Sequence, residues 1–134
     1  HSDVWAGNSP YEVVVWVPFM DVKNSQSMYL LPKDESLKIY ENYGESGTNN
    51  SEIFNENKHK FVWPNVKKGQ AIIFSHALIH GNVKNEEAKT RFSMNLRFKS
   101  LMSPYGDKGL GEYFVPVEMM AATEIGLEVS QFYE

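Results

Sequence analysis

The sequence contains no cysteine, and this absence removes several classes of protein at once. No disulfide framework can staple the fold, and no zinc site with thiolate ligands can form. Long apolar runs are also missing: the longest, residues 13–19, is interrupted by Pro18, so neither a membrane-spanning helix nor a signal peptide is expected. Positive charge is not in excess, because 13 Lys and Arg residues oppose 17 Asp and Glu residues, for a net charge of -4. A general nucleic-acid-binding protein, which needs a basic face, is therefore not indicated.

The remaining composition is that of an ordinary globular chain. Its 134 residues are 42% hydrophobic and 22% charged, which is enough for one hydrophobic core without covalent staples. We therefore expect a single domain over residues 1–134. Because a lack of cysteine fits a reducing compartment, we expect the protein to be cytoplasmic.

Most local patterns predict β-strands. Five segments have the composition or the alternation typical of strands: residues 11–19, 27–31, 61–63, 71–74 and 91–101. In the last of these, polar and apolar residues alternate, which places Arg91, Ser93, Asn95 and Arg97 on one face. Many short strands separated by turns favour a sandwich or a barrel.

Helices are predicted at only two places. Residues 34–42 form a short amphipathic pattern with Asp34 as a candidate N-cap, and residues 118–132 form a weaker one with Thr123 in that role. The stretch 43–60 is polar and rich in Asn and Gly, so it predicts a long loop. Loops of this length in compact domains often cover a binding site, and we expect this one to be a candidate lid.

His1 and Asp3 are the first candidates for a metal site. In an extended chain, positions i and i+2 point the same way, so both side chains can reach one ion from the same side. His80 is the best candidate for a second imidazole, because it follows an apolar strand and precedes Gly81, where the chain can turn. Two His and one carboxylate with open positions opposite are typical of non-haem Fe(II) oxygenases. His76 is expected at the surface or behind the ligands rather than on the metal.

Arg91 and Ser93 are candidates for binding an anion. An arginine that faces the inside of a barrel is costly unless it meets a negative group, and its guanidinium suits a carboxylate. A serine hydroxyl beside it can donate one more hydrogen bond. The alternative is a solvent-exposed polar face, because Asn95 and Arg97 continue the same pattern. Asn82 and Asn95 are weaker candidates for cofactor contacts in the same pocket.

Taken together, these motifs resemble a known enzyme family. In chain order they are His1-x-Asp3, His80-Gly81-Asn82 and Arg91-x-Ser93. This order resembles that of the Fe(II)/2-oxoglutarate-dependent dioxygenases, and most of all their phytanoyl-CoA dioxygenase-like branch, which includes bacterial members found with carbohydrate-biosynthesis genes. Residues 16–19, followed by Asp21 and Asn24, are similar to a Trp-containing strand of that branch. The resemblance covers residues 1 to about 100 and corresponds to the C-terminal part of such a domain.

The resemblance implies a mainly β fold, a double-stranded β-helix or jelly roll that is truncated at its N-terminus and carries a short C-terminal helix. It implies Fe(II) held by His1, Asp3 and His80. It implies 2-oxoglutarate as co-substrate on Arg91 and Ser93. The implied activity hydroxylates or oxidises a small polar or carbohydrate-related substrate while 2-oxoglutarate is decarboxylated to succinate and CO2, in a bacterial cytoplasm.

Other interpretations fit the same residues. A non-catalytic jelly-roll module could bind a carbohydrate or a partner subunit, with Trp5, Trp63 and Tyr105 stacking on sugar rings. Alternatively, a terminal His1 could bind copper through its amine and its ring, as in secreted copper polysaccharide monooxygenases. Exposed strand edges could also pair with a second copy, so a homodimer is expected.

Overall fold

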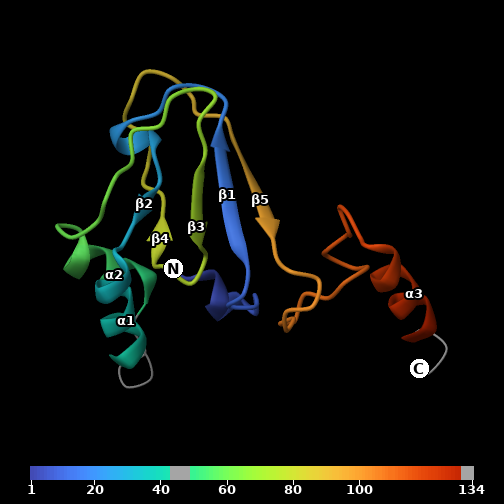
Figure 1. The fold of residues 1–134 in the computed structure, drawn as a ribbon. Helices are drawn as coiled ribbons and strands as arrows, with labels where there is room; N and C mark the ends of the chain where they lie inside the picture. The colour runs from blue at the N-terminus through green and yellow to red at the C-terminus, as the bar shows by residue number, and fades with distance from the viewer. Residues whose placement is uncertain (43–48, 131–134) are drawn as a thin grey trace.

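The structure of the chain is a computed structural model that describes residues 1–42 and 49–130. Its elements are, in order, the 3-10 helix η1 (Asp3–Ala6), β1 (Val13–Pro18), the 3-10 helix η2 (Asn24–Gln26), β2 (Tyr29–Leu30), α1 (Lys33–Asn42), α2 (Asn50–Asn57), β3 (Ile72–Ser75), β4 (His80–Gly81), β5 (Ser93–Phe98) and α3 (Ala121–Ser130). Small antiparallel sheets and three α-helices make up this architecture (Figure 1). No helix in these two ranges has the length and apolar character needed to cross a membrane.

Strand β1 is the centre of the larger sheet, with β3 on one side and β5 on the other, both antiparallel to it. In this register Val14 lies opposite Phe74 on β3 and Arg97 on β5, and Trp16 lies opposite Asn95. Side chains of directly opposed residues share one face of a sheet. The polar residues of β5 therefore lie on the same face as the buried residues of β1, which we call the inner face.

Two hydrophobic clusters form the core. The first lies on the inner face of the larger sheet and consists of Val14, Trp16, Val22, Met28, Val66 and Phe74. The second joins the small β2–β4 sheet to α2 and consists of Tyr29, Leu31, Ile53, Phe61 and Ile79. His80 on β4 packs edge-on against Phe74 of the first cluster (5.1 Å between ring centroids), and its chain neighbour Ile79 belongs to the second cluster.

Several predicted elements are confirmed. The expected strands at 11–19, 71–74 and 91–101 correspond to β1, β3 and β5, and the expected helix at 34–42 corresponds to α1. The strand expected at 27–31 shortens to the two-residue β2. At 61–63 the expected strand is reduced to one isolated bridge between Leu30 and Val62.

The prediction of a loop over 43–60 is wrong for residues 50–57, which form α2. The helix begins with a capping box: the Asn49 side chain accepts hydrogen bonds from the backbone N–H groups of Ser51 and Glu52, and the Glu52 carboxylate accepts one from the N–H of Asn49. Burial of Ile53 in the second cluster then stabilises a helix that its polar composition did not indicate. Positions 43–48 lie outside the described residues.

The C-terminal helix predicted within residues 118–132 is present, but it begins before its predicted N-cap. Helix α3 starts at Ala121, so Thr123 lies inside its first turn and is not the N-cap. Positions 131 and 132 of the predicted helix lie outside the described residues. In Figure 1, α3 is set apart from the sheets.

Glu35 on α1 joins this helix to the segment after α2. Its carboxylate accepts hydrogen bonds from Lys38 (2.5 Å) and Lys60 (2.7 Å). These two hydrogen bonds lower the pKa of Glu35 from 4.5 to about 2. A pKa that is lower in the folded state stabilises the fold above the unfolded value and loses this contribution as the pH falls towards 2.

We therefore expect Glu35→Gln to lower the free energy of unfolding at pH 7 by a small amount, because the pair is exposed. The difference from the parent chain should shrink as the pH is lowered from about 4.5 to about 2. Urea titrations across this pH range measure it, with Glu41→Gln on the same helix as control. A difference that stays constant with pH would show that the two lysines do not act through the Glu35 charge.

Candidate metal centre

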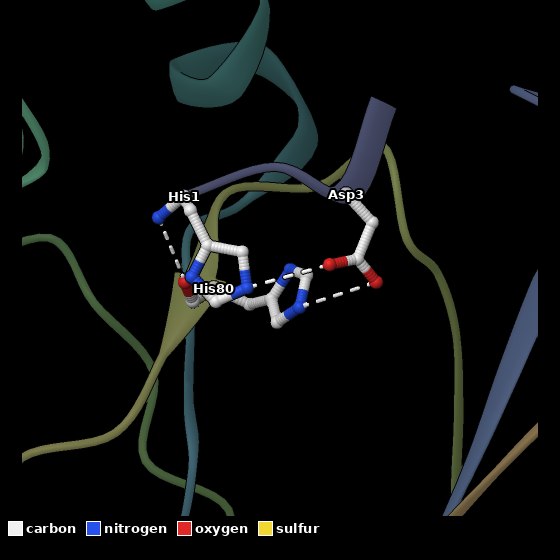
Figure 2. Close-up of side chains that lie close together, drawn as sticks. All are labelled: His1, Asp3 and His80. Carbon is white, nitrogen blue, oxygen red and sulfur yellow. Dashed lines mark hydrogen bonds and ion pairs between the residues drawn. The ribbon is translucent and has the colours of Figure 1, made fainter. Parts of the chain in front are cut away.

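His1, Asp3 and His80 point towards one another in the structure, as Figure 2 shows. Each offers one ligand atom, and these atoms all lie within 4.8 Å of one another. His1 Nε2 is 3.4 Å from Asp3 Oδ1, and His80 Nε2 is 3.8 Å from Asp3 Oδ2. Ligands held about 2.1 Å from an ion in perpendicular directions stand about 3 Å apart, so a small contraction brings this group to metal-binding distances.

The main chain fixes His1 beside His80. The backbone nitrogen of His1 donates to the carbonyl oxygen of His80 (3.0 Å), and the nitrogen of His80 donates to the carbonyl oxygen of His1 (2.9 Å). Between the two ligands of the first motif, Ser2 is buried, and its hydroxyl donates to the carbonyl oxygen of His76 (3.3 Å) and hydrogen bonds with the hydroxyl of Tyr40. Hydrogen bonds on both chain segments therefore hold the candidate ligands in place.

The local geometry of His1 and Asp3 differs from a strand. Ser2 is extended (φ -118°, ψ 140°), which keeps the two flanking side chains on one side as expected. At Asp3, however, the chain turns into η1, and the residue that caps this turn is Gly7, whose φ of 80° is a left-handed conformation that favours glycine. The predicted juxtaposition is present, but it is produced by one extended residue followed by a helical turn.

His80 is held in the form that a metal requires. Its Nδ1 lies 2.8 Å from the carbonyl oxygen of Leu78, which can only accept, so Nδ1 carries the hydrogen and Nε2 keeps a free lone pair. His80 Nε2 faces Oδ2 of Asp3 (Figure 2). Burial lowers the pKa of His80 below its ordinary value, which favours the neutral ring.

Asp3 is a buried carboxylate held by Arg97, a residue that the sequence analysis placed only on a polar face. Arg97 Nη2 donates to Asp3 Oδ2 (2.7 Å), and Arg97 Nη1 donates to Asn8 Oδ1 (3.0 Å). Burial by itself raises the pKa of Asp3. The hydrogen bond with His1 and the charge of Arg97 act against burial, so the pKa is lowered and the carboxylate stays ionised.

Behind Asp3 lies a second pair of buried ionisable groups, Glu12 and His76, whose side chains have no solvent exposure. His76 Nδ1 is 3.6 Å from Glu12 Oε2 and 3.9 Å from Asp3 Oδ2. The other ring nitrogen of His76 lies 2.5 Å from the carbonyl oxygen of Ser9, and the other Glu12 oxygen accepts from the Ser9 N–H (2.9 Å). Among the buried side-chain atoms described, only Glu12 Oε2 and His76 Nδ1 lack a hydrogen-bond partner, and they face each other. His76 is thus behind the ligands, one of its two predicted places.

Arg91 is partly buried at the edge of the inner face. Its guanidinium lies 5.6 Å from the centre of the Trp16 ring and donates to the carbonyl oxygen of Gln26 (2.9 Å) and to Asn82 Oδ1 (2.8 Å). Burial lowers the pKa of Arg91. Within residues 1–42 and 49–130, no carboxylate forms an ion pair with it, so its charge is met by neutral acceptors and an aromatic ring.

The remaining predicted cofactor residues lie on the same face. Ser93 is opposite Pro18 and Asn95 is opposite Trp16, on the inner face of the sheet. Asn82, two residues after His80, contacts Arg91 directly. Asn82 therefore links Arg91 to the segment that carries His80, and Ser93 and Asn95 lie on the inner face of the sheet.

A hollow of about 590 Å³ opens beside the triad. Its walls come from His1, from the β2–β4 sheet and its continuation, and from α2; the lining residues besides His1 are Tyr29, Asn50, Ser51, Phe54, Asn55, Gly81, Asn82 and Val83. A larger hollow of about 920 Å³ near residues 19–26 and 65–70 contains none of the three candidate ligands. The smaller one is therefore the candidate substrate pocket, and α2 lies where the lid was predicted.

Comparison with known proteins adds no relative to this description: no family model, no curated protein and no solved structure matches the chain. The candidate function therefore depends on the geometry of the site alone.

Two residues of this site were missed from the sequence. Arg97 carried a usable signal, because it is on the same strand face as Arg91 and Ser93. Glu12 carried none, since a glutamate before an apolar strand is usually solvated and only the fold shows it to be 1% exposed beside His76.

Proposed function

We propose that the chain carries the metal and 2-oxoglutarate site of an Fe(II)-dependent oxygenase with a double-stranded β-helix fold. The observation that carries the proposal is the convergence of His1, Asp3 and His80 within 4.8 Å, with His80 in the neutral tautomer that leaves Nε2 free. Two imidazoles and one carboxylate are the donor set of non-haem Fe(II) sites. The antiparallel three-stranded sheet with an inward polar face is compatible with one wall of such a fold.

Different side chains are proposed to bind the metal ion and 2-oxoglutarate. Arg97 engages Oδ2 of Asp3, which leaves Oδ1, on the side of His1, to bind an ion through one oxygen. Arg91 provides a positive charge without a carboxylate partner in the described chain, which suits the distant carboxylate of 2-oxoglutarate, with Asn82, Ser93 and Asn95 in supporting places. The iron, when bound, would supply the oxygen chemistry that oxidises a C–H bond and releases succinate and CO2.

The substrate pocket is proposed to be the hollow beside His1. Its polar walls are amides and a hydroxyl, and its apolar walls include Tyr29 and Phe54, whose ring centroids are 5.1 Å apart. Neutral amides and aromatic faces suit the small polar or carbohydrate-related substrate that the sequence motifs imply.

Arg91→Ala is expected to weaken 2-oxoglutarate binding by about tenfold to 100-fold, the value of a charge-assisted hydrogen bond, while leaving the affinity for Mn(II) unchanged. Calorimetric titration of the Mn(II)-loaded chain with 2-oxoglutarate measures the first effect, and titration with Mn(II) alone measures the second. Lys89→Ala, an exposed cation two residues away, is the matched control.

The proposal as a whole requires 2-oxoglutarate to raise the melting temperature only when a divalent metal is present. It also requires the Fe(II)-loaded chain to release succinate from 2-oxoglutarate. If 2-oxoglutarate binds equally well without metal, or equally well to the Arg91 variant, the assigned clamp is wrong.

A further inference from the structure

The face of the larger sheet opposite the core is apolar and open to solvent. The strand register places eight positions on it: Val13, Val15, Val17, Ile73, Ser75, Met94, Leu96 and Phe98. Only Ser75 among them is polar, and none carries a charge. We call this set the apolar sheet face.

Its residues are far more exposed than a sheet interior allows. Ile73 is 69% exposed, and the side chains of Phe98, Val13, Met94 and Leu96 lie between 36% and 42%. At one end the face continues into Phe19 and Phe92, which are 54% and 69% exposed and are joined by a backbone hydrogen bond of 2.9 Å. On the opposite face β1 and β3 already pack on the core, so these two strands carry apolar side chains on both sides and need a second covering layer.

No described segment of the chain supplies that layer. The exposed fractions are those of the chain with all its described elements in place, and Figure 1 shows α3 apart from the sheet. Large uncovered apolar patches on folded proteins mark interaction surfaces.

The size and charge of the face fit a second copy of the same chain. Taking about 200 Å² for a large apolar side chain, the five exposed residues of the apolar sheet face together with Phe19 and Phe92 expose roughly 700 Å², close to the roughly 800 Å² that each partner contributes to a standard interface. The chain has a net charge of -4, so the overall charge opposes the association of two copies. On the apolar sheet face they would meet without desolvating a single charge.

We propose that two copies pack through their apolar sheet faces, sheet against sheet, about a two-fold axis. Sheets packed in this way lie about 10 Å apart with interdigitated side chains, and an isologous contact uses the same residues from both copies. This differs from pairing at strand edges, because the edges of β3 and β5 remain free. It does not depend on the metal chemistry proposed above.

Two lysine substitutions on opposite sides of β1 test the proposal. Ile73 on β3 and Leu96 on β5 both lie opposite Val15, in the same row of the face. Each is at the surface of a single copy, so Ile73→Lys and Leu96→Lys should leave the fold of the monomer intact, as a far-ultraviolet circular dichroism spectrum would confirm. Sedimentation equilibrium from micromolar to submillimolar concentration should show a dimer for the parent chain and at least a 100-fold weaker one for each variant.

Leu37→Lys is the matched control, because Leu37 is 48% exposed on α1, away from this face, and its variant should dimerise like the parent. An edge-to-edge dimer would respond to only one of the two test variants, which would overturn the proposal. A parent chain that is monomeric throughout the range, or a dimer that survives both lysines, would overturn it as well.

Discussion

Replacement of His80 by alanine is expected to reduce the affinity of the chain for a divalent metal by at least ~100-fold, because the donor set loses its most pre-organised ligand. The Nδ1–H of His80 is fixed by the carbonyl oxygen of Leu78 at 2.8 Å, so Nε2 needs no reorientation before it binds. Its side chain is 9% exposed, and alanine leaves no donor in its place. Titration with Mn(II), followed by electron paramagnetic resonance of the free ion, measures the loss.

The control for this experiment is His59→Ala, an exposed histidine between two lysines that the structure keeps out of the triad. The parent chain and this control should both melt at a higher temperature with Mn(II), whereas the His80 variant should not respond. His80→Gln separates ligand loss from a packing defect, since it retains bulk but lacks the imidazole. Equal Mn(II) affinity in the His80 variants and the parent would remove the metal centre and the function that depends on it.

Replacement of Glu12 by alanine is expected to destabilise the fold by about 1–3 kcal/mol, because it leaves the buried N–H of Ser9 without its acceptor. Glu12 is fully buried, accepts a hydrogen bond from the N–H of Ser9 and faces His76 Nδ1 at 3.6 Å. Alanine leaves His76 without this neighbour and opens a cavity. Urea unfolding at pH 7 measures the change.

Three further variants make this result specific. Glu12→Gln keeps the shape and the hydrogen bond from Ser9, so its loss should be smaller than that of Glu12→Ala. Glu41→Ala, an exposed glutamate, should change the free energy of unfolding by less than ~0.5 kcal/mol. The double variant Glu12→Leu with His76→Leu removes both polar groups. Its loss in free energy of unfolding should be smaller than the sum of the losses in the single variants Glu12→Leu and His76→Leu. Strict additivity would show that the two groups do not interact.

The part of the site that could be predicted from sequence is the part encoded in local spacing. His1-x-Asp3 needed only one extended residue between its ligands, and Ser2 is that residue. His80 was identified from its place after an apolar strand, and it occupies β4 directly after that region. The local pattern for β1, β3, β5 and α1 was strong for the same reason: periodicity of 2 or 3.6 is a property of the chain itself.

The wrong predictions share one physical cause. Helix α2 has a polar composition, so its stability depends on a capping box and on Ile53 entering a core that other segments build. The strand expected at 61–63 has suitable residues but only one bridging partner, Leu30, so no ladder forms. In both cases the structure of the segment depends on contacts with distant parts of the chain, and these contacts leave no periodic pattern in the segment itself.

The sequence by itself determined the absence of disulfides and thiolate sites, the identity of the three candidate ligands and the two faces of β5. It could not determine which of those faces turns inward, because alternation defines two sides but not the location of the core. The tertiary structure decided this by pairing β5 with β1: Arg97 came to lie opposite Val14 and within 2.7 Å of Asp3, while Leu96 was left in solvent. The orientation of β5 depends on its register with β1, whose residues are some 80 positions away in the chain, and no local pattern in the sequence encodes this register.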